Sequence, residues 1–263
     1  MDMILCEAIR IAKLAGIKIK EIRENKGFSE SLKDGYELTT SADIVSNDII
    51  KSEIIRLFNN HEIMSEEDAE NEVKSLHSPT WIIDPIDGTV GYANGHYQVA
   101  VSIAFAIDKN VKYGVVYNPF LDELFYATAN AGAFLNGKRI FVKNVTDLRT
   151  CIIGTGFPHK KENIYDIINR LGLILPNVRD IRRMGSPALD ICWVACGRMQ
   201  GFYEEELHSW DVAAAKLIAS EAGASIGYFK EINGFVPECI RSNGIIVSSP
   251  GVFNELKELL AVP

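Results

Sequence analysis

The chain has 263 residues, a formal net charge of −8 and a hydrophobic fraction of 47%. This length allows one large domain or two lobes, and the acidic balance argues against nucleic acid as the main ligand, because nucleic-acid binders usually carry basic patches. No apolar run reaches the roughly 18 residues of a membrane-spanning helix, and the first residues lack the basic region of a secretion signal. We therefore expect a cytoplasmic protein with no membrane partner.

The first half of the chain alternates between helical and strand patterns. Apolar residues at helical spacing predict a helix over 3–24, and a second helix from Ile44 to about Asn59. Continuous apolar runs then predict strands at 81–83, 98–107, 111–116 and 123–127, with a hairpin at 108–110.

A change of composition near 143–149 indicates a boundary between an N-terminal lobe, 1–145, and a C-terminal lobe, 146–263. Beyond it we predict short strands and helices in alternation. The strands are expected at 151–155, 201–203 and 244–248, and the helices at 162–171, 186–196, 211–222 and 252–260. Helices that cover sheets in two successive lobes indicate a layered α/β protein with its site in the cleft between the lobes.

The segment from Trp81 to Thr89, with the sequence WIIDPIDGT, is the most informative stretch. Two carboxylates, Asp84 and Asp87, follow a buried strand, and hard divalent cations prefer such oxygen ligands. Pro85 sets the φ angle for a turn that would bring both carboxylates to one cation. Gly88 and Thr89 would then offer backbone N–H groups to an anion, especially if a helix begins there. The alternative is a simple strand-to-loop turn, since each residue of the segment is turn-prone.

Two further segments carry acidic residues in suggestive positions. Glu66, Glu67 and Asp68 follow an apolar pair, and alone they are typical of a solvated charge run. Asp211 precedes a run of small and apolar residues at helical spacing, and alone it is typical of a helix cap.

Together, these three segments resemble the inositol monophosphatase family, part of the superfamily of magnesium-dependent, lithium-sensitive sugar phosphatases. That family carries an acidic pair, then WIIDPIDGT, then Trp-Asp-x-Ala-Ala ahead of Glu-Ala-Gly, and this chain has the same segments in the same order. The resemblance covers nearly the whole chain and includes GVVYNP at 114–119, ELFYA at 123–127, GAFLNG at 132–137 and RRMGS at 182–186.

The resemblance implies a layered α-β-α-β-α sandwich that acts as a homodimer and hydrolyses a phosphate monoester, with myo-inositol monophosphate as the expected substrate. Fructose-1,6-bisphosphatase, histidinol-phosphatase and 3′(2′),5′-bisphosphate nucleotidase activities are the rivals on the same scaffold. A rival of another class is a regulatory binding protein that keeps the fold. Four carboxylates placed together would repel one another without a cation, which argues against a purely structural role.

The resemblance also assigns ligands to magnesium. A first ion is expected on Glu66, Asp84 and the backbone carbonyl of Ile86, and a second on Asp84, Asp87 and Asp211, so that Asp84 bridges the two. Two-metal sites support in-line phosphoryl displacement in this way. A third, weaker ion near Glu66 is also considered, and Glu67 is expected outside the ligand shell.

By the same resemblance, Thr89 and Asp43 orient and deprotonate the attacking water, while the N–H groups of Gly88 and Thr89 hold the phosphate. From the residues alone, Asp43 could equally be a helix N-cap before Ile44. Substrate hydroxyls are expected at Gly185, Ser186 and Glu204, and Arg183 is a candidate for a hydroxyl or a second phosphate. His159 and Lys160 are considered for the mouth of the cleft.

The chain also departs from the family pattern. Val90-Gly91-Tyr92 stands where Thr-Asn-Phe is usual, Ala224 replaces a glycine, and Pro187 removes an N–H from the turn after Ser186. None of these changes touches an expected metal ligand, so they bear on substrate preference.

Overall fold

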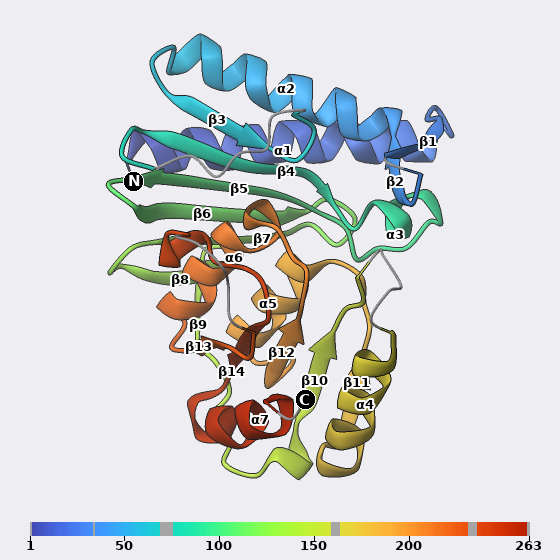
Figure 1. Cartoon of the computed structure of the whole chain (residues 1–263). Helices are drawn as coiled ribbons and strands as arrows, with labels where there is room; N and C mark the ends of the chain where they lie inside the picture. The colour runs from blue at the N-terminus through green and yellow to red at the C-terminus, as the bar shows by residue number, and fades with distance from the viewer. Residues whose placement is uncertain (1, 34, 69–75, 159–163, 231–235, 262–263) are drawn as a thin grey trace.

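The computed structural model describes residues 2–33, 35–68, 76–158, 164–230 and 236–261. Within these residues the structure has five layers that alternate between helices and sheets (Figure 1). The expected α-β-α-β-α sandwich is therefore confirmed. No helix in the described residues is long and apolar enough to cross a membrane.

The first sheet lies between the first and second helical layers. In the described residues it has seven strands in chain order, and every neighbouring pair is antiparallel except the parallel pair β3–β4. Its strands are β3 (Glu62–Ser65), β4 (Thr80–Asp87), β5 (Ala100–Ile107), β6 (Asn110–Asn118), β7 (Glu123–Thr128), β8 (Gly132–Leu135) and β9 (Lys138–Ile140).

Helices α1 (Met3–Glu24) and α2 (Ser41–Leu57) cover the outer face of this sheet. The side chain of Asp2 caps α1 by accepting the N–H of Ile4 at 2.9 Å. Leucine, isoleucine and alanine side chains repeat at helical spacing along α1 and are buried against the sheet, as the sequence predicts.

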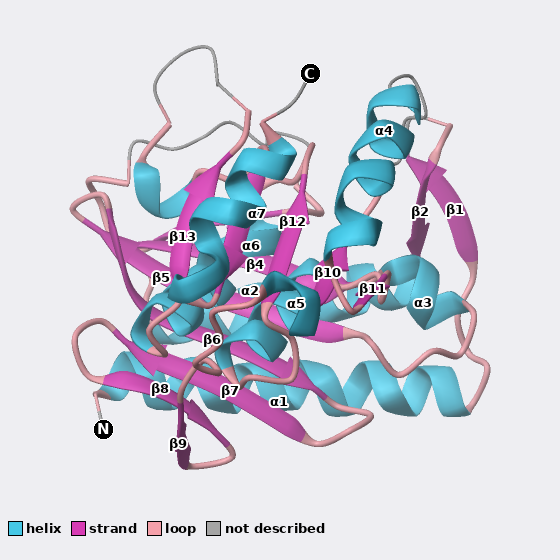
Figure 2. Cartoon of the chain, turned by 90° about the horizontal axis from the view of Figure 1, so that it is seen from below, coloured by secondary structure: helices cyan, strands magenta, loops and turns pink. Residues whose placement is uncertain are grey.

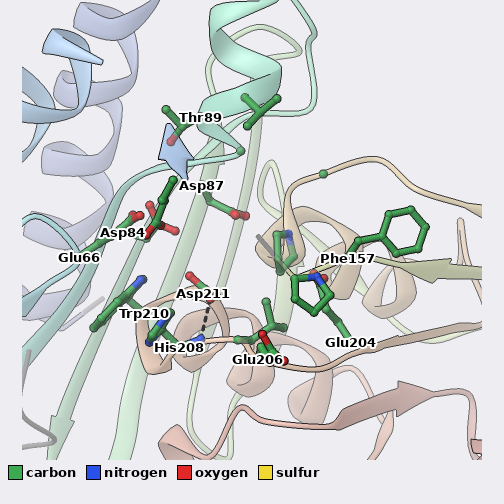
Figure 3. Close-up of a pocket in the computed structure, with 18 of the residues that line it drawn as sticks. Glu66, Asp84, Asp87, Thr89, Phe157, Glu204, Glu206, His208, Trp210 and Asp211 are labelled. Carbon is green, nitrogen blue, oxygen red and sulfur yellow. Dashed lines mark hydrogen bonds between the residues drawn. The ribbon is translucent and has the colours of Figure 1, made fainter. Parts of the chain in front are cut away.

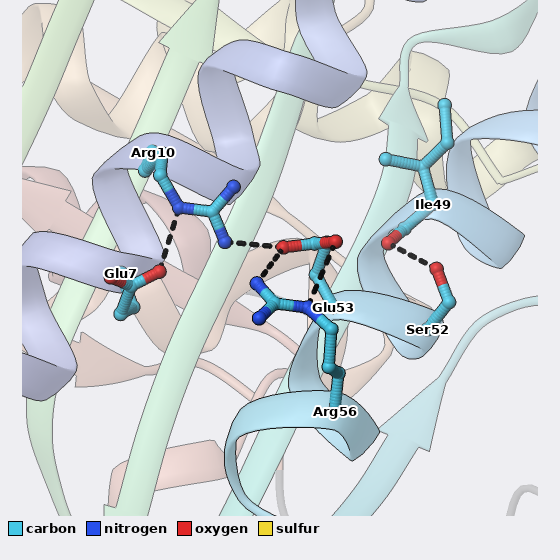
Figure 4. Close-up of polar contacts among 6 residues, drawn as sticks. All are labelled: Glu7, Arg10, Ile49, Ser52, Glu53 and Arg56. Carbon is cyan, nitrogen blue, oxygen red and sulfur yellow. Dashed lines mark hydrogen bonds and ion pairs between the residues drawn. The ribbon is translucent and has the colours of Figure 1, made fainter.

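A surface network of charges joins the two outer helices (Figure 4). Arg10 on α1 donates to Glu7 and to Glu53 on α2, and Glu53 also accepts from Arg56. The arginines are exposed and the glutamates partly exposed, so the network contributes little to the free energy of unfolding compared with the buried apolar face.

Helices α5 (Pro187–Ala195) and α6 (Ser209–Glu221) form the central layer between the two sheets. Both are apolar on nearly every side, as expected of helices that have a sheet on either face. The two helices pack on each other; α6 contacts strands β4 to β8 of the first sheet, and α5 contacts β10, β12 and β14 of the second.

The second sheet has the order β11-β10-β12-β14-β13 among the described residues. Its strands are β10 (Ile152–Thr155), β11 (Asp180–Arg182), β12 (Gly201–Glu204), β13 (Ser225–Tyr228) and β14 (Ile245–Ser248). Helices α4 (Ile164–Ile174) and α7 (Phe253–Leu260) cover its outer face and complete the fifth layer. Single 3₁₀ turns lie at Leu148–Thr150, Leu175–Asn177, Glu238–Ile240 and Pro250–Val252.

A small hairpin of β1 (Glu30–Lys33) and β2 (Glu37–Thr40) lies beside the short helix α3 (Thr89–Ala93) (Figure 2). The hairpin does not join either sheet. It extends from the end of α1 to the start of α2, so it borders the end of β4 where the informative motif lies.

Most of the expected elements are confirmed to within a few residues. Helix α2 begins at Ser41 rather than Ile44, and α4 runs to Ile174 rather than Leu171, with residues 162–163 of the predicted helix outside the described part. The patterns missed the short strands β1, β2, β3, β8, β9, β11 and β13. The first sheet ends at Ile140 and the second begins at Ile152, but whether 1–145 and 146–263 behave as separate lobes stays a prediction.

Candidate active site

A cavity of about 430 Å³ opens between the end of β4 and the loop that joins β12 to α6 (Figure 3). Its walls bring together segments that are far apart in the sequence. The described residues that line it include Glu66, Asp84, Ile86, Asp87, Gly88, Thr89, Arg183, Gly185, Glu204 and Asp211. Of the described residues expected at the site, only Asp43 and Ser186 lie behind the wall, and both are buried.

The aspartate motif is a bulged strand and not a turn. Strand β4 continues through Pro85 to Asp87. Asp84 pairs with Ser102 and Asp87 pairs with Ala100, so three residue steps on β4 lie opposite two steps on β5. In a regular strand, residues three apart point to opposite faces. The extra residue of the bulge restores a common side, which explains how both carboxylates reach the cavity. The expectation of a turn set by Pro85 was wrong, although the convergence that it was meant to explain is present.

Hydrogen bonds at the N-terminal ends of α5 and α6 hold the carboxylates of Asp87 and Asp211. The Asp87 Oδ2 atom accepts the Ser186 hydroxyl at 2.5 Å and the Ala188 N–H at 2.8 Å. Asp211 Oδ2 accepts the N–H of His208 at 2.7 Å, so the N-cap of α6 is His208, and Asp211 is the third residue of a capping box and not the cap itself. In each case one oxygen is held by the protein, so the orientation of the carboxylate is set before any ligand arrives.

The Ser186 hydroxyl was expected to meet a substrate hydroxyl, and the structure corrects this. Ser186 is fully buried, donates to Asp87 and caps α5 by accepting the N–H of Leu189. Its polar atom is thus committed to orienting a carboxylate of the site.

Burial and mutual repulsion raise the pKa values of the acidic side chains that line the cavity. Burial raises the pKa of Asp87 to about 8 and that of Asp211 to about 7. Burial also raises the pKa of Asp84 and of Glu66 well above the usual range, and the charge of a neighbouring carboxylate adds to each rise. Four acidic side chains therefore share a region where a proton or another cation must offset their charge.

The oxygen atoms that could act as metal ligands in the cavity suit a hard divalent cation. The Asp84 Oδ1 atom is buried and accepts no hydrogen bond from the described protein atoms, and the other available donors are carboxylate oxygens. In the described part of the chain, no three His, Cys, Asp or Glu side chains meet ligand geometry as they stand.

Asp43 and Thr89 form a hydrogen-bonded pair next to the carboxylates. Thr89 Oγ1 lies 3.0 Å from Asp43 Oδ1 and 3.1 Å from the Ile86 carbonyl oxygen, and it can donate to either. The N–H and hydroxyl of Thr40 hold the other Asp43 oxygen, Oδ2, at 2.8 and 2.6 Å. The N-cap of α2 is therefore Thr40 and not Asp43, which is the third residue of a capping box. Burial raises the pKa of Asp43 to about 6.

Gly88 connects the strand to helix α3 in the left-handed region, with φ +96°. A Cβ atom at this position would lie 2.8 Å from the Gln98 carbonyl oxygen, so the close turn requires glycine. Gly88 provides no side-chain cap, and the first N–H groups of α3 follow directly beside the carboxylates. This placement suits an anion that is also attracted to a bound cation.

Glu204 and Arg183 lie on the opposite wall, at the end of β12 and in the loop after β11. Glu204 is buried, and burial raises its pKa well above the usual range, with a further contribution from the nearby Asp190. Its carboxylate packs so closely over Gly156 that a Cβ atom there would collide with it. Arg183 lies near Phe157, 5.7 Å from the ring centre, and its guanidinium covers Gly185.

Sequence patterns missed several residues that support the site. Lys33 on the β1–β2 hairpin donates to Glu67 at 2.5 Å, and the nearby charge of Glu66 helps to raise the Lys33 pKa. Glu205 makes ion pairs with Arg170 of α4 at 2.5 Å and with Lys230 at 3.2 Å. These contacts join residues more than 20 positions apart, so no local pattern could signal them. His159 and Lys160 lie outside the described residues.

Comparisons with known proteins point to one family. The model of the inositol monophosphatase family matches residues 1–261. Among curated proteins, a Vibrio cholerae protein named Nus factor SuhB is 36% identical over 95% of this chain and 92% of its own length. Inositol monophosphatase 1 of Solanum lycopersicum is 37% identical over 85% of this chain and 83% of its own length.

Solved structures agree with these matches. The SuhB protein of Bartonella henselae superimposes with a TM-score of 0.89 at 29% identity, over 98% of each chain. The IMPase of Thermotoga maritima gives a TM-score of 0.84 at 30% identity, over 96% of this chain and 94% of its own. A Staphylococcus aureus IMPase-II structure with bound inositol monophosphate gives 0.81 at 25% identity, over 98% and 93%.

Proposed function

This chain belongs to the inositol monophosphatase family and is a phosphatase, and we propose that it hydrolyses inositol monophosphate or a similar phosphorylated polyol with magnesium. The observation that carries the proposal is the bulge in β4. It brings Asp84 and Asp87 to the same side of the strand, where Asp211 and Glu66 also line the cavity. The bound inositol monophosphate of the Staphylococcus aureus relative supports the substrate class.

We propose that Glu66, Asp84 and the Ile86 carbonyl hold one magnesium ion, and that Asp84, Asp87 and Asp211 hold a second. A third, weaker ion near Glu66 belongs to the same proposal. When bound, magnesium would lower the pKa of water and offset the negative charge that the phosphate brings. The buried Asp84 Oδ1 atom, which accepts no hydrogen bond from the described residues, supports this assignment.

The protein's own groups can carry the proton of the attacking water. The Thr89 hydroxyl can accept a hydrogen bond from water while it donates to Asp43 Oδ1. As the water oxygen bonds to phosphorus, the bond between phosphorus and the ester oxygen breaks; the water proton passes to Thr89, the Thr89 proton passes to Asp43, and the departing oxygen takes up a proton from solvent. The pKa of about 6 suits Asp43 to accept a proton near neutral pH, while Thr40 keeps the carboxylate oriented.

We propose that the N–H groups of Gly88 and Thr89 bind the phosphate and that Glu204, Gly185 and Arg183 face the polyol. Backbone N–H groups that are already oriented can stabilise charge that develops in the transition state. The position of Glu204 on the opposite wall, over Gly156, supports a role in accepting substrate hydroxyls.

Glu204→Gln is expected to weaken polyol phosphates selectively. Loss of a hydrogen bond to a charged group costs about 1.5–3 kcal/mol, which corresponds to about ten- to a hundredfold in kcat/KM. p-Nitrophenyl phosphate has no hydroxyls beside its phosphate and should scarcely respond. Gly156→Ala should have the same selectivity, because the added methyl group displaces the Glu204 carboxylate. Equal loss on both esters would place the polyol elsewhere in the cavity.

A phosphate-release panel tests the proposed function. It compares inositol 1-phosphate, fructose 1,6-bisphosphate, histidinol phosphate and adenosine 3′,5′-bisphosphate, each with magnesium and after chelation. We expect the highest kcat/KM for inositol 1-phosphate, dependence on magnesium, and inhibition by lithium. Undiminished release after exhaustive chelation would rule out the metal proposal, and preference for another ester would assign one of the rival activities.

A role in transcription is the second candidate function, because several relatives at 33–36% identity are named Nus factor SuhB. It is compatible with phosphatase chemistry. An Asp84→Asn protein without phosphatase activity separates these possibilities. A role in transcription that depends only on binding should persist in this variant, whereas a role that depends on phosphate hydrolysis should be lost.

We also propose a homodimer. Helix α4 exposes Tyr165 at 78% and Ile168 at 54% of their surface, and Leu175 follows at 57%. Apolar exposure of this kind is typical of a surface that another chain covers. A monomeric mass in light scattering at micromolar concentration would contradict this assembly.

A further inference from the structure

The loop that joins β12 to α6 contains a glutamate in an unfavourable backbone conformation. Glu206 has φ +62°, in the left-handed region that favours glycine. Among the described non-glycine residues with positive φ, it is the one that lines the site cavity, and its side chain is exposed there. A strained residue at a functional site suggests that the side chain contributes to function.

Contacts on both sides hold this backbone in place. The N–H of Glu206 donates to Asn243 Oδ1 at 3.0 Å, and Ser242 donates to the next carbonyl, that of Leu207. On the other side, Glu205 is buried and anchored by Arg170 and Lys230. These contacts hold the backbone of Glu206 at the wall of the cavity.

The described cavity wall has a marked excess of acidic groups. Eight of its residues are aspartate or glutamate, and one is arginine. Magnesium would offset Glu66, Asp84, Asp87 and Asp211, and Glu205 already has two cationic partners. The remaining carboxylates are Glu37, Glu204 and Glu206; no described cation forms an ion pair with Glu206. Figure 3 shows Glu204 and Glu206 in the lower half of the view, well away from Thr89.

We propose that Glu206 is a specificity-determining residue, which excludes substrates that carry a second phosphate and thereby restricts the enzyme to monophosphates. The inference rests on the proposed function, because it takes the reacting phosphate to lie by Gly88 and Thr89. The rest of the substrate then extends toward the wall that carries Glu204 and Glu206. A hydroxyl there can donate to a carboxylate, whereas a phosphate has only negative oxygens to offer and is repelled.

Matched ligands and variants test this proposal. Fructose 1-phosphate and fructose 1,6-bisphosphate differ by one phosphate, and so do adenosine 3′-monophosphate and adenosine 3′,5′-bisphosphate. Glu206→Gln removes the charge, and Glu206→Gly removes the charge together with the strain. Asp108 is an exposed acid with φ +51° in the β5–β6 hairpin and does not line the cavity, so Asp108→Asn and Asp108→Gly are the controls.

We expect the ratio of bisphosphate to monophosphate affinity, measured calorimetrically with calcium in place of magnesium so that the esters stay intact, to rise about tenfold in both Glu206 variants. The ratio of kcat/KM values should follow, and the Asp108 variants should match the wild type. Because an exposed charge is screened by salt, the difference should shrink between low and high ionic strength.

An unchanged ratio in both Glu206 variants would overturn the proposal. A rise in Glu206→Gly alone would also overturn it, because loop freedom and not charge would then control selection. The affinity measurement needs no turnover, so it decides the role of Glu206 even if the phosphate-release panel rejects inositol phosphate as the substrate.

Discussion

Asp84→Asn is expected to lower kcat on inositol 1-phosphate by at least about a hundredfold, since metal activation of water contributes several kcal/mol. Asp84 is the carboxylate proposed to contact both magnesium ions, and its Oδ1 atom has no other partner among the described protein atoms. Asparagine keeps the size of the side chain and removes the charge. The measurement is steady-state phosphate release at saturating substrate and increasing magnesium.

Asp190→Asn provides a matched control for this change. Asp190 is also a buried carboxylate with a raised pKa, but it lies behind the wall of the cavity on α5. The control should keep most of its turnover. Near-normal kcat in Asp84→Asn would show that Asp84 is not a shared ligand.

The stability of the metal-free protein is expected to fall as the pH rises from about 4 to about 8. In the folded state the pKa values of Asp43, Asp211 and Asp87 are about 6, 7 and 8, against an ordinary value of 3.8. The folded protein therefore binds more protons than the unfolded chain in this window, and its stability is lost as those protons leave. A loss of at least about 2 kcal/mol corresponds to a fall in Tm of about 5 °C.

Magnesium should reverse this trend, because binding requires deprotonated carboxylates and acts only on the folded site. Thermal unfolding with a chelator and with magnesium, at several pH values, measures the effect. Asp84→Asn should flatten the metal-free curve by removing one of the repelling charges. A metal-free Tm that rises steadily with pH would contradict the repulsion argued for this cluster.

The sequence predicted the layers and the acidic cluster well because both depend on local patterns. Helix α1 repeats apolar residues over 22 positions, and β4 is an uninterrupted buried run that ends in the aspartate motif. The predicted geometry of that motif was wrong because a bulge depends on the register with β5, which a single strand does not encode. The cap of α2 was misplaced for a related reason, since Thr40 and Asp43 both satisfy the composition of a capping box.

The supporting contacts could not be predicted at all. Lys33 reaches Glu67 from a four-residue strand with no apolar alternation, and Arg170 reaches Glu205 across 35 positions. Arg170 is a buried cation on a helix that exposes apolar side chains, the reverse of the usual amphipathic pattern. Contacts of this kind depend on tertiary packing, so residue type and spacing carry no signal for them.

The residues proposed for hydrolysis and those proposed for substrate selection come from different sheets, which bears on how new specificities arise. The acidic cluster and the Asp43–Thr89 pair belong to the first sheet and the helices packed on it, including α6, whereas Glu204 and Glu206 belong to the second sheet and its loop. On the proposed assignment of roles, substitutions around β12 alter which ester is accepted and leave the hydrolytic residues largely untouched. Such a scaffold can gain a new substrate through a few changes on one side, without passing through intermediates that have lost catalysis.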